Sequence, residues 1–324
     1  MSEWTGLSGD LFLDEAISDE TRAVIELVEA ISAQNPPIEN EIPAEIRKQR
    51  REGKGAFPKP VYSDRATTRT IPGPGGEINL RIIAPENPKG ALLYIHGGGW
   101  TLGALDAQDP LLEVIADNAD LACVSVGYRL APEHPYPAAP DDCEAAALWF
   151  VENAQKEFGT DRLLISGPSA GAHLSLVTML RLRDRHGMTP FCGADLTYGG
   201  YDLTMSPSQR NWGDRRLILN TPILQWFRSN FLPADKFDTD AKQHPDISPI
   251  FADLTGLPPA LFTVGTMDPL LDDTLSMYAR WIAAGNVGQL EIVPGGIHAF
   301  NLFPSKITSD HKDRMLAFLN ACGQ

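Results

Sequence analysis

The chain has 324 residues, of which 43% are hydrophobic, and its formal net charge at pH 7 is −15, with a pI near 4.8. A chain with this much negative charge repels nucleic-acid phosphates and anionic membranes. We therefore expect neither as a partner and expect a small-molecule ligand instead. The length and the hydrophobic content allow one large core, and we therefore expect a single domain over residues 1–324.

The start of the chain and its cysteines indicate a cytoplasmic protein. Residues 1–19 lack the basic start and long apolar run of a signal peptide, and no stretch is long enough to span a membrane. Cys123, Cys143, Cys192 and Cys322 have neither paired nor metal-type spacing, and the histidines and carboxylates are scattered. We expect free thiols and no metal site.

The first part of the chain predicts two helices and a hairpin. Residues 14–33 have apolar side chains at helical spacing and run into a pair of prolines, and a second short helix is expected over 43–51. Strands are expected at 67–71 and 77–84, joined by a turn at 72–76 that is rich in proline and glycine.

From residue 91 onward, strand patterns alternate with helix patterns. This alternation is typical of a mostly parallel sheet with helices on both faces, here of about eight strands including the hairpin. The strands are expected near 91–95, 121–127, 162–166, 192–198, 260–265 and 289–293, and the helices near 110–119, 139–158, 171–186, 272–285 and 309–321.

An insertion at about 199–245 interrupts the alternation. It carries Trp212, Trp226, Phe227 and Phe231, which is more aromatic surface than a connecting loop needs. A cap over a binding site would bury these rings, although they could also form a small core of the insertion itself.

A serine stands in the turn between a predicted strand and the next helix. Residues 167–171 have the sequence Gly-Pro-Ser-Ala-Gly, and the small residues around Ser169 suit a turn too tight for larger side chains. The same short pattern occurs in ordinary glycine loops, but the flanking strand and helix favour an exposed nucleophile. We therefore expect Ser169 to be a catalytic residue.

A serine hydroxyl needs a base, and the chain offers one together with a carboxylate. Asp268 follows the strand at 260–265, and His298 lies in a glycine-rich loop after the strand at 289–293. The order Ser, Asp, His on successive strand ends is that of α/β-hydrolases. The other histidines lack this combination of positions, so His298 is the expected base and Asp268 its partner.

The residues after the strand at 91–95 are His-Gly-Gly-Gly-Trp, and consecutive glycines let backbone N–H groups approach and stabilise an oxyanion. With this motif upstream of the serine turn, the chain resembles the hormone-sensitive lipase family of α/β-hydrolases, the bacterial family IV carboxylesterases. The resemblance covers roughly residues 65–320. It extends through residues 128–139, Ser248-Pro249 and Asp268-Pro269-Leu270.

The resemblance implies an α/β-hydrolase fold and assigns roles by position. The N–H groups of Gly98 and Gly99 would hold the oxyanion, joined by that of Ala170 from the turn geometry. His96 and Gly97 would position the glycine loop.

The resemblance also implies that residues at about 1–50 form part of the cap with the insertion, although terminal helices can simply pack on a core. It allows a homodimer. Two residues depart from the family pattern, because Pro168 replaces the usual Asp before the serine and Ala172 replaces a glycine. Pro168 should stiffen the turn while losing the hydrogen bonds of an Asp side chain, which leaves fine positioning and substrate preference open.

Other candidate residues have plainer interpretations. His173, four residues after the serine, is expected to point along its helix. Asp272 and Asp273 open a helix and are expected to cap it or to favour its dipole. Three further acidic residues at the start of a helix are expected to be solvated rather than to contact the serine turn or the glycine loop. They are Asp141, Asp142 and Glu144.

Together these features predict a carboxylesterase that acts by acyl transfer on small-molecule esters without a cofactor. An aromatic cap limits the pocket, so the rate should peak at acyl chains of two to about eight carbons. An amidase or arylformamidase could use the same triad. A non-catalytic receptor is a further alternative, but the hormone receptors of this fold have lost the histidine that stands here at position 298.

Overall fold

The structure is a computed structural model that describes residues 7–54 and 59–323, so the first six residues of the predicted cap segment lie outside it. Its centre is one eight-stranded sheet in the order β1-β2-β4-β3-β5-β6-β7-β8. β1 and β2 form a hairpin, β2 pairs antiparallel with β4, and all other neighbours are parallel. The strands are Thr67–Gly73 (β1), Gly76–Ile83 (β2), Gly90–Tyr94 (β3), Leu121–Gly127 (β4), Leu163–Pro168 (β5), Phe191–Thr197 (β6), Ala260–Met267 (β7) and Gly288–Ile297 (β8).

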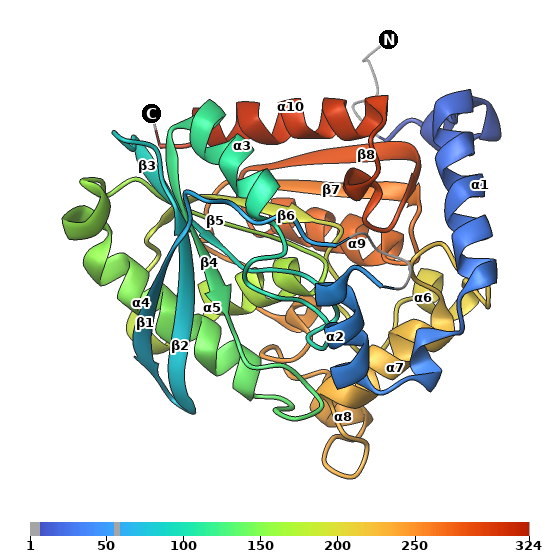
Figure 1. Ribbon diagram of the computed structural model, residues 1–324, viewed down its shortest axis with the longest axis horizontal. Coiled ribbons are helices and arrows are strands. Elements are labelled where there is room, and N and C mark those ends of the chain that lie inside the picture. Colours follow the sequence, from blue (N-terminus) through green and yellow to red (C-terminus); the bar gives the residue numbers. More distant parts are fainter. Residues whose placement is uncertain (1–6, 55–58, 324) are drawn as a thin grey trace.

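Helices cover both faces of this sheet, as the alternation predicted (Figure 1). One face carries α3 (Asp109–Ala119) and α10 (Lys306–Ala321). The other carries α4 (Ala138–Phe158), α5 (Ala170–His186) and α9 (Leu271–Ala283). The structure therefore confirms the α/β-hydrolase architecture expected from the sequence.

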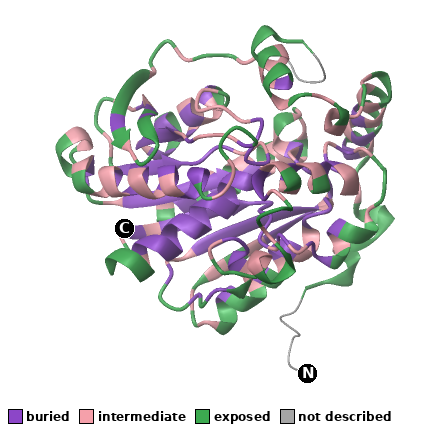
Figure 2. Cartoon of the chain, turned by 90° about the horizontal axis from the view of Figure 1, so that it is seen from below, coloured by how far each residue is buried: buried purple, intermediate pink, exposed green. Residues whose placement is uncertain are grey.

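The core consists of layers on the two faces of the sheet. Side chains alternate across a strand, so Leu92 and Tyr94 pack towards α3 and α10, whereas Leu93 and Ile95 pack towards α4 and α5. Figure 2 shows the buried residues gathered in the sheet and the exposed ones on the outer surfaces of the helices. With both faces covered, the central strands are almost continuously apolar, and every residue of β3 is buried.

Several predicted boundaries differ by a few residues. The first long helix, α1 (Asp19–Gln34), begins five residues later than expected, because the Ser18 side chain accepts a hydrogen bond from the Thr21 N–H and caps the helix there. Short 3₁₀ turns precede it. β8 extends to Ile297, so the strand leads directly to His298. The second helix, α2 (Pro43–Glu52), agrees with its prediction.

The insertion contains three short helices, α6 (Pro207–Asn211), α7 (Thr221–Phe231) and α8 (Thr239–Lys242). Asp273 in α9 is 2% exposed and holds the start of the insertion, since its carboxylate accepts hydrogen bonds from four groups. They are the Tyr201 and Asp202 N–H groups, the Ser206 hydroxyl and the Gln209 amide.

This anchor differs from the predicted capping role of Asp272 and Asp273. Both lie in the first turn of α9, but Asp272 accepts from the Ser208 N–H and therefore also binds the insertion. Burial raises the pKa of Asp273 to about 6, although its hydrogen bonds to Ser206 and Gln209 oppose that rise.

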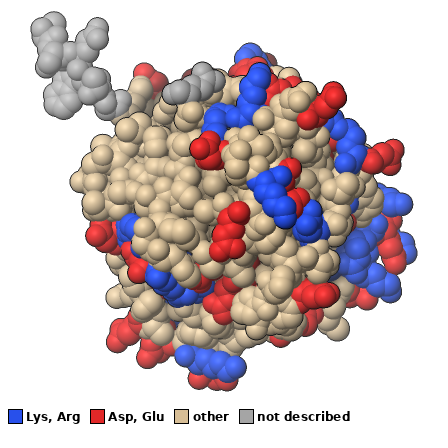
Figure 3. Space-filling view, turned by 90° about the vertical axis from the view of Figure 1, so that its left-hand side faces the viewer, with Lys and Arg blue, Asp and Glu red and all other residues tan. Residues whose placement is uncertain are grey.

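The state of the cysteines, the character of the helices and the distribution of surface charge can be read from the structure. The four cysteines are free, as expected. No described helix has both the length and the apolar character needed to cross a membrane. On the face drawn in Figure 3, acidic and basic side chains are interspersed rather than gathered by sign.

Candidate active site

The turn between β5 and α5 presents Ser169 in a strained backbone conformation, with φ of 56° and ψ of −122°. The Ser169 N–H donates to the Thr197 carbonyl in β6 at 2.9 Å. A Cβ atom added to Gly167 or Gly171 would lie 2.4 or 1.9 Å from the Ile95 carbonyl oxygen. The small residues predicted around the serine are therefore required, because β3 passes directly behind the turn.

The three predicted triad residues come together at the carboxyl edge of the sheet. His298 Nε2 lies 3.0 Å from the Ser169 hydroxyl oxygen, and His298 Nδ1 lies 2.8 Å from Asp268 Oδ2. Asp268 is 1% exposed, and its second oxygen accepts from the Leu270 N–H at 2.9 Å. The carboxylate therefore has a single orientation, which holds the imidazole towards the serine.

Tyr198 packs against the imidazole, and the sequence reading missed it. Its ring centroid is 4.7 Å from that of His298, and its hydroxyl donates to Asn301 Oδ1 at 2.7 Å. Tyr198 directly follows β6, which lies between β5 and β7 in the sheet. Its place at that strand end was the available signal, because neighbouring parallel strands end at the same edge.

The glycine loop lies beside the serine, as predicted. A Cβ atom on Gly97 would lie 3.5 Å from the Ser169 Cβ, and one on Gly99 would lie 2.2 Å from the Phe227 ring. Gly98 and Gly99 have φ values of 108° and 58°, which favour glycine. Within residues 7–54 and 59–323, no acceptor is bonded to their N–H groups. The first N–H groups of a helix have no intrahelical acceptor either, and Ala170 begins α5.

His96 contacts the loop at its start. The ring donates from Nδ1 to the Gly97 carbonyl at 2.8 Å and stacks on Tyr128, with centroids 4.1 Å apart. The Tyr128 hydroxyl in turn donates to the His96 carbonyl. Burial lowers the pKa of His96 to about 4, so the imidazole is neutral at neutral pH.

His173 also contacts this loop. It accepts from the Trp100 indole N–H at 3.2 Å through Nδ1 and donates through Nε2 to the Ile247 carbonyl at 2.8 Å. The ring is fully buried, and burial lowers its pKa to about 4. His173 is therefore a neutral link between α5, the glycine loop and the segment after the insertion.

Of the acidic residues at the start of α4, Asp142 is buried, so the prediction that it is solvated is wrong, whereas Asp141 and Glu144 are partly buried. Asp142 is 1% exposed and binds the Arg129 guanidinium at 2.8 Å. Asp141 and Glu144 bind Arg181 at 2.8 and 3.0 Å. A buried carboxylate needs a charged partner, and these arginines supply it from distant positions in the chain.

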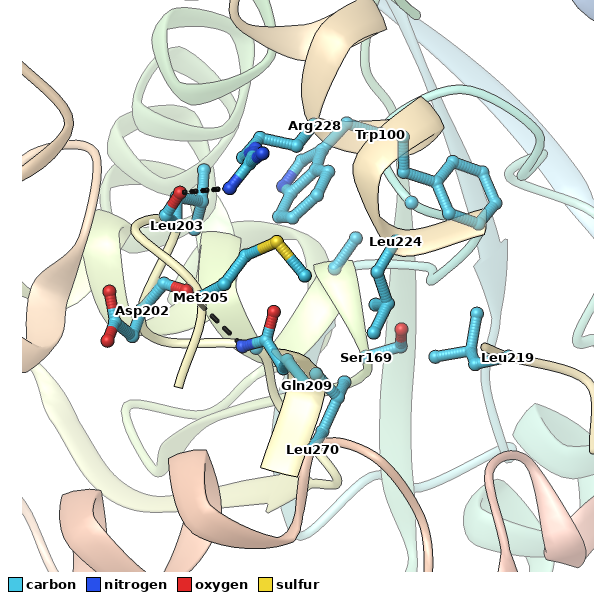
Figure 4. Close-up of a pocket in the computed structure, with 14 residues that line it drawn as sticks. Trp100, Ser169, Asp202, Leu203, Met205, Gln209, Leu219, Leu224, Arg228 and Leu270 are labelled. Carbon is cyan, nitrogen blue, oxygen red and sulfur yellow. Dashed lines mark hydrogen bonds between the residues drawn. The ribbon is translucent and has the colours of Figure 1, made fainter. Parts of the chain in front are cut away.

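A small cavity of about 40 Å³ opens beside Ser169 and is mostly apolar. In Figure 4, side chains of the insertion, Arg228 and Gln209 among them, make up most of its lining. Arg228 donates to the Leu203 carbonyl at 3.4 Å, and Gln209 donates to the Asp202 carbonyl at 3.3 Å. The cavity can therefore take a short, mainly apolar group attached to the atom that the serine attacks.

A larger cavity of about 460 Å³ also reaches Ser169, and its lining includes His298. Residues of the N-terminal segment, from Ser32 to Arg51, line it together with Ile223 and Phe227 of the insertion. Among the described residues, no three His, Cys, Asp or Glu side chains gather closely enough to hold a metal ion.

Comparisons with known proteins agree with this geometry. A family model described as alpha/beta hydrolase fold matches residues 92–302. The carboxylic ester hydrolase LipN of Mycobacterium tuberculosis is 37% identical over 76% of this chain and 68% of its own. The ethyl acetate hydrolase of Pseudomonas putida is 33% identical over 76% and 78%. A solved structure, the hyperthermophilic esterase of the archaeon Pyrobaculum calidifontis, is 29% identical with a TM-score of 0.81 over 94% of this chain and 98% of that one. The chain therefore belongs to the hormone-sensitive lipase family of α/β-hydrolases, and it is a hydrolase.

Proposed function

We propose that the protein is a carboxylesterase that cleaves esters of short- to medium-chain acids by acyl transfer. The proposal rests on the hydrogen-bonded line from Asp268 through His298 to Ser169. Ser169 attacks the ester carbonyl while His298 takes its proton and then gives it to the leaving alcohol. Asp268 fixes the tautomer of the imidazole and stabilises its charged form. Water, activated by the same histidine, then releases the acid.

The oxyanion formed in each step would bind the N–H groups of Gly98, Gly99 and Ala170. Two of these groups lie in the glycine loop beside the serine, and the third begins α5. Loss of one such donor typically costs about 10² to 10³ in rate. His96 and Gly97 would keep the loop in place through the contacts described above.

The two cavities suggest how an ester lies in the site. His298 lines only the larger of them, and it must reach the leaving oxygen, so the alcohol would occupy the larger cavity and the acyl group the smaller. A single water needs about 10–15 Å³, so about 40 Å³ holds a short acyl chain. We further propose that the N-terminal helices and the insertion, which line these cavities, form the cap.

The test is hydrolysis of 4-nitrophenyl acetate beside 4-nitroacetanilide, its matching anilide. We expect the ester to be cleaved and the anilide to react far more slowly, because an amide carbonyl is less electrophilic and 4-nitroaniline is a poorer leaving group than 4-nitrophenolate. Comparable rates would make the protein an amidase. A folded protein that cleaves neither would be a receptor that uses the cavity only for binding.

A further inference from the structure

The larger cavity has the opposite charge balance from the chain. The chain contains 27 Lys and Arg against 42 Asp and Glu. Among the described residues that line the cavity, five are basic and one is acidic. They are Arg47, Arg50, Arg51, Lys59 and Arg216 against Asp106. This reversal places positive charge in the space that opens on Ser169, within a molecule whose net charge is negative.

These basic groups differ in how far they are neutralised. Arg47 pairs with Glu133, so its charge is balanced. Arg216 is half-buried and donates to the Asn35 carbonyl at 2.9 Å, but no carboxylate of the described residues pairs with it. A guanidinium has five N–H donors, so one carbonyl leaves several of them for another acceptor. The next residue in the chain, Arg215, is different, because it pairs with Glu29 at 2.7 Å.

Two more of the five basic residues have no acidic partner of this kind among the described residues. Arg51 and Lys59 form no salt bridge with a carboxylate in the described part of the chain. Arg51 and Lys59 are exposed, whereas Arg216 is half-buried, and partial shielding from water strengthens the attraction between Arg216 and an anionic ligand. Arginine suits carboxylate and phosphate groups in particular, since its planar fork can donate two parallel hydrogen bonds.

We propose that the larger cavity binds an alcohol or phenol that carries an anionic group, a carboxylate or a phosphate, held by Arg216 and assisted by the charge of Arg51 in the same lining. This inference rests on the proposed esterase function, because it assigns the leaving alcohol to the cavity that His298 lines. The positive field of the cavity would also draw anionic esters towards Ser169 faster than neutral ones. The natural substrate is then an ester of a short acid with an anionic alcohol.

The test uses acetate esters that share one acyl group and differ in charge. They are 4-acetoxybenzoate, 4-acetoxyphenyl phosphate and methyl 4-acetoxybenzoate, each corrected for its own rate of alkaline hydrolysis. We expect at least one anionic ester to have a kcat/KM about tenfold above that of the neutral ester at low salt. That advantage should decrease in about 1 M salt, where the Debye length is only ~3 Å and the longer-range attraction of the cavity is screened. The two anionic esters distinguish a carboxylate site from a phosphate site.

Two neighbouring arginines provide a matched pair of variants. Arg216→Gln should lower the ratio of anionic to neutral kcat/KM by about three- to tenfold, and Arg51→Gln should also lower it. Arg215→Gln removes the same charge from a residue outside the cavity and should leave the ratio unchanged. Melting curves would show whether each variant is folded. If Arg216→Gln does not fold, Arg51→Gln serves as the test variant.

Three results would overturn the inference. They are a neutral ester that is cleaved as well as both anionic ones, an anionic advantage that salt does not reduce at all, and equal losses in Arg215→Gln and Arg216→Gln. If the folded protein cleaves none of the three acetates, the proposed esterase function itself fails, so the two failures can be distinguished.

Discussion

The indole of Trp100 in the glycine loop stacks on the ring of Phe231 at the end of α7, with centroids 4.7 Å apart and planes 12° apart. The same indole donates its N–H to His173 in α5. The loop beside Ser169 is therefore held by the insertion on one side and by α5 on the other. A change in the insertion can thus disturb the loop without touching a triad residue.

This stacking predicts that Phe231→Ala lowers both stability and rate. Phe231 is fully buried, and loss of such a ring typically costs about 3–5 kcal/mol in the free energy of unfolding. Denaturant unfolding measures that cost. The kcat for 4-nitrophenyl acetate shows whether the glycine loop is still correctly placed beside Ser169. Phe251 is 44% exposed, so Phe251→Ala is the matched control and should change neither quantity appreciably. Equal losses in both variants would contradict the proposed link.

The triad predicts that Ser169→Ala lowers kcat by about 10⁶ while the melting temperature stays close to that of the wild type. An organophosphonate should add its mass to the wild type and not to this variant. Ser175 lies buried in the same helix and has no hydrogen-bond partner among the described residues. Ser175→Ala should therefore keep its activity, and an adduct in Ser169→Ala would refute the assignment of the nucleophile.

Asp268→Asn should lower kcat by about 10⁴, because an amide no longer selects the imidazole tautomer that accepts the serine proton. The fold should be retained, since Asn can still accept the Leu270 N–H bond. Asp272→Asn is the control, because this carboxylate binds the Ser208 N–H and lies outside the hydrogen-bonded line. The initial rates of purified variants measure the effect, and a loss of less than tenfold would argue against a role for Asp268.

Variants of two adjacent residues in α7 should distinguish the cavity that binds the acyl group from the cavity that binds the alcohol. Leu224 lines the small cavity and Ile223 the large one. Leu224→Ala should move the acyl-length optimum of kcat/KM for 4-nitrophenyl esters upward by roughly two carbons, because each methylene gains free energy only where it is buried. Ile223→Ala should leave that optimum in place and instead favour acetates of bulkier alcohols. The reverse pattern would mean that the acyl group occupies the large cavity and the alcohol the small one.

Two buried histidines, His96 and His173, predict that acid destabilises the protein. Their pKa values fall from 6.5 in the unfolded chain to about 4 in the fold, so unfolding takes up protons between these values. Stability should be constant above roughly pH 7 and decrease as pH falls from 6.5 to 4, by about 3 kcal/mol for each of His96 and His173. The raised pKa of Asp273 acts in the opposite sense, because its loss of a proton disfavours the fold as pH rises towards 6.

A comparison of variants isolates one histidine from these opposing effects. Gln at position 173 is neutral and can both accept from the indole and donate to the carbonyl, so His173→Gln should show a weaker dependence of unfolding free energy on pH between 4 and 6.5. His134 is exposed, and His134→Gln should keep the wild-type dependence. Denaturant melts across this range provide the measurement, and identical slopes in all three proteins would refute the prediction.

The sequence by itself determined the mostly parallel sheet, the order of strands and helices along the chain and the identity of the candidate triad. Ser169, Asp268 and His298 each directly follow a strand, and glycines lie close to Ser169 and His298, so local chemistry marks these positions without knowledge of their partners. Parallel strands end at one edge, and that rule alone brings the three positions together. The glycine loop was found in the same way, since positive φ values demand glycine locally.

Only the tertiary structure decided the contacts between distant segments. Asp273 holds the insertion through Tyr201, 72 residues earlier in the chain, and a local reading could offer only a helix cap for it. Tyr198 meets His298, and Arg216 lines the cavity while Arg215 does not, although the two arginines are adjacent in sequence. Backbone preferences act over a few residues, whereas the direction of each side chain depends on which surfaces pack together, and only the complete fold determines that.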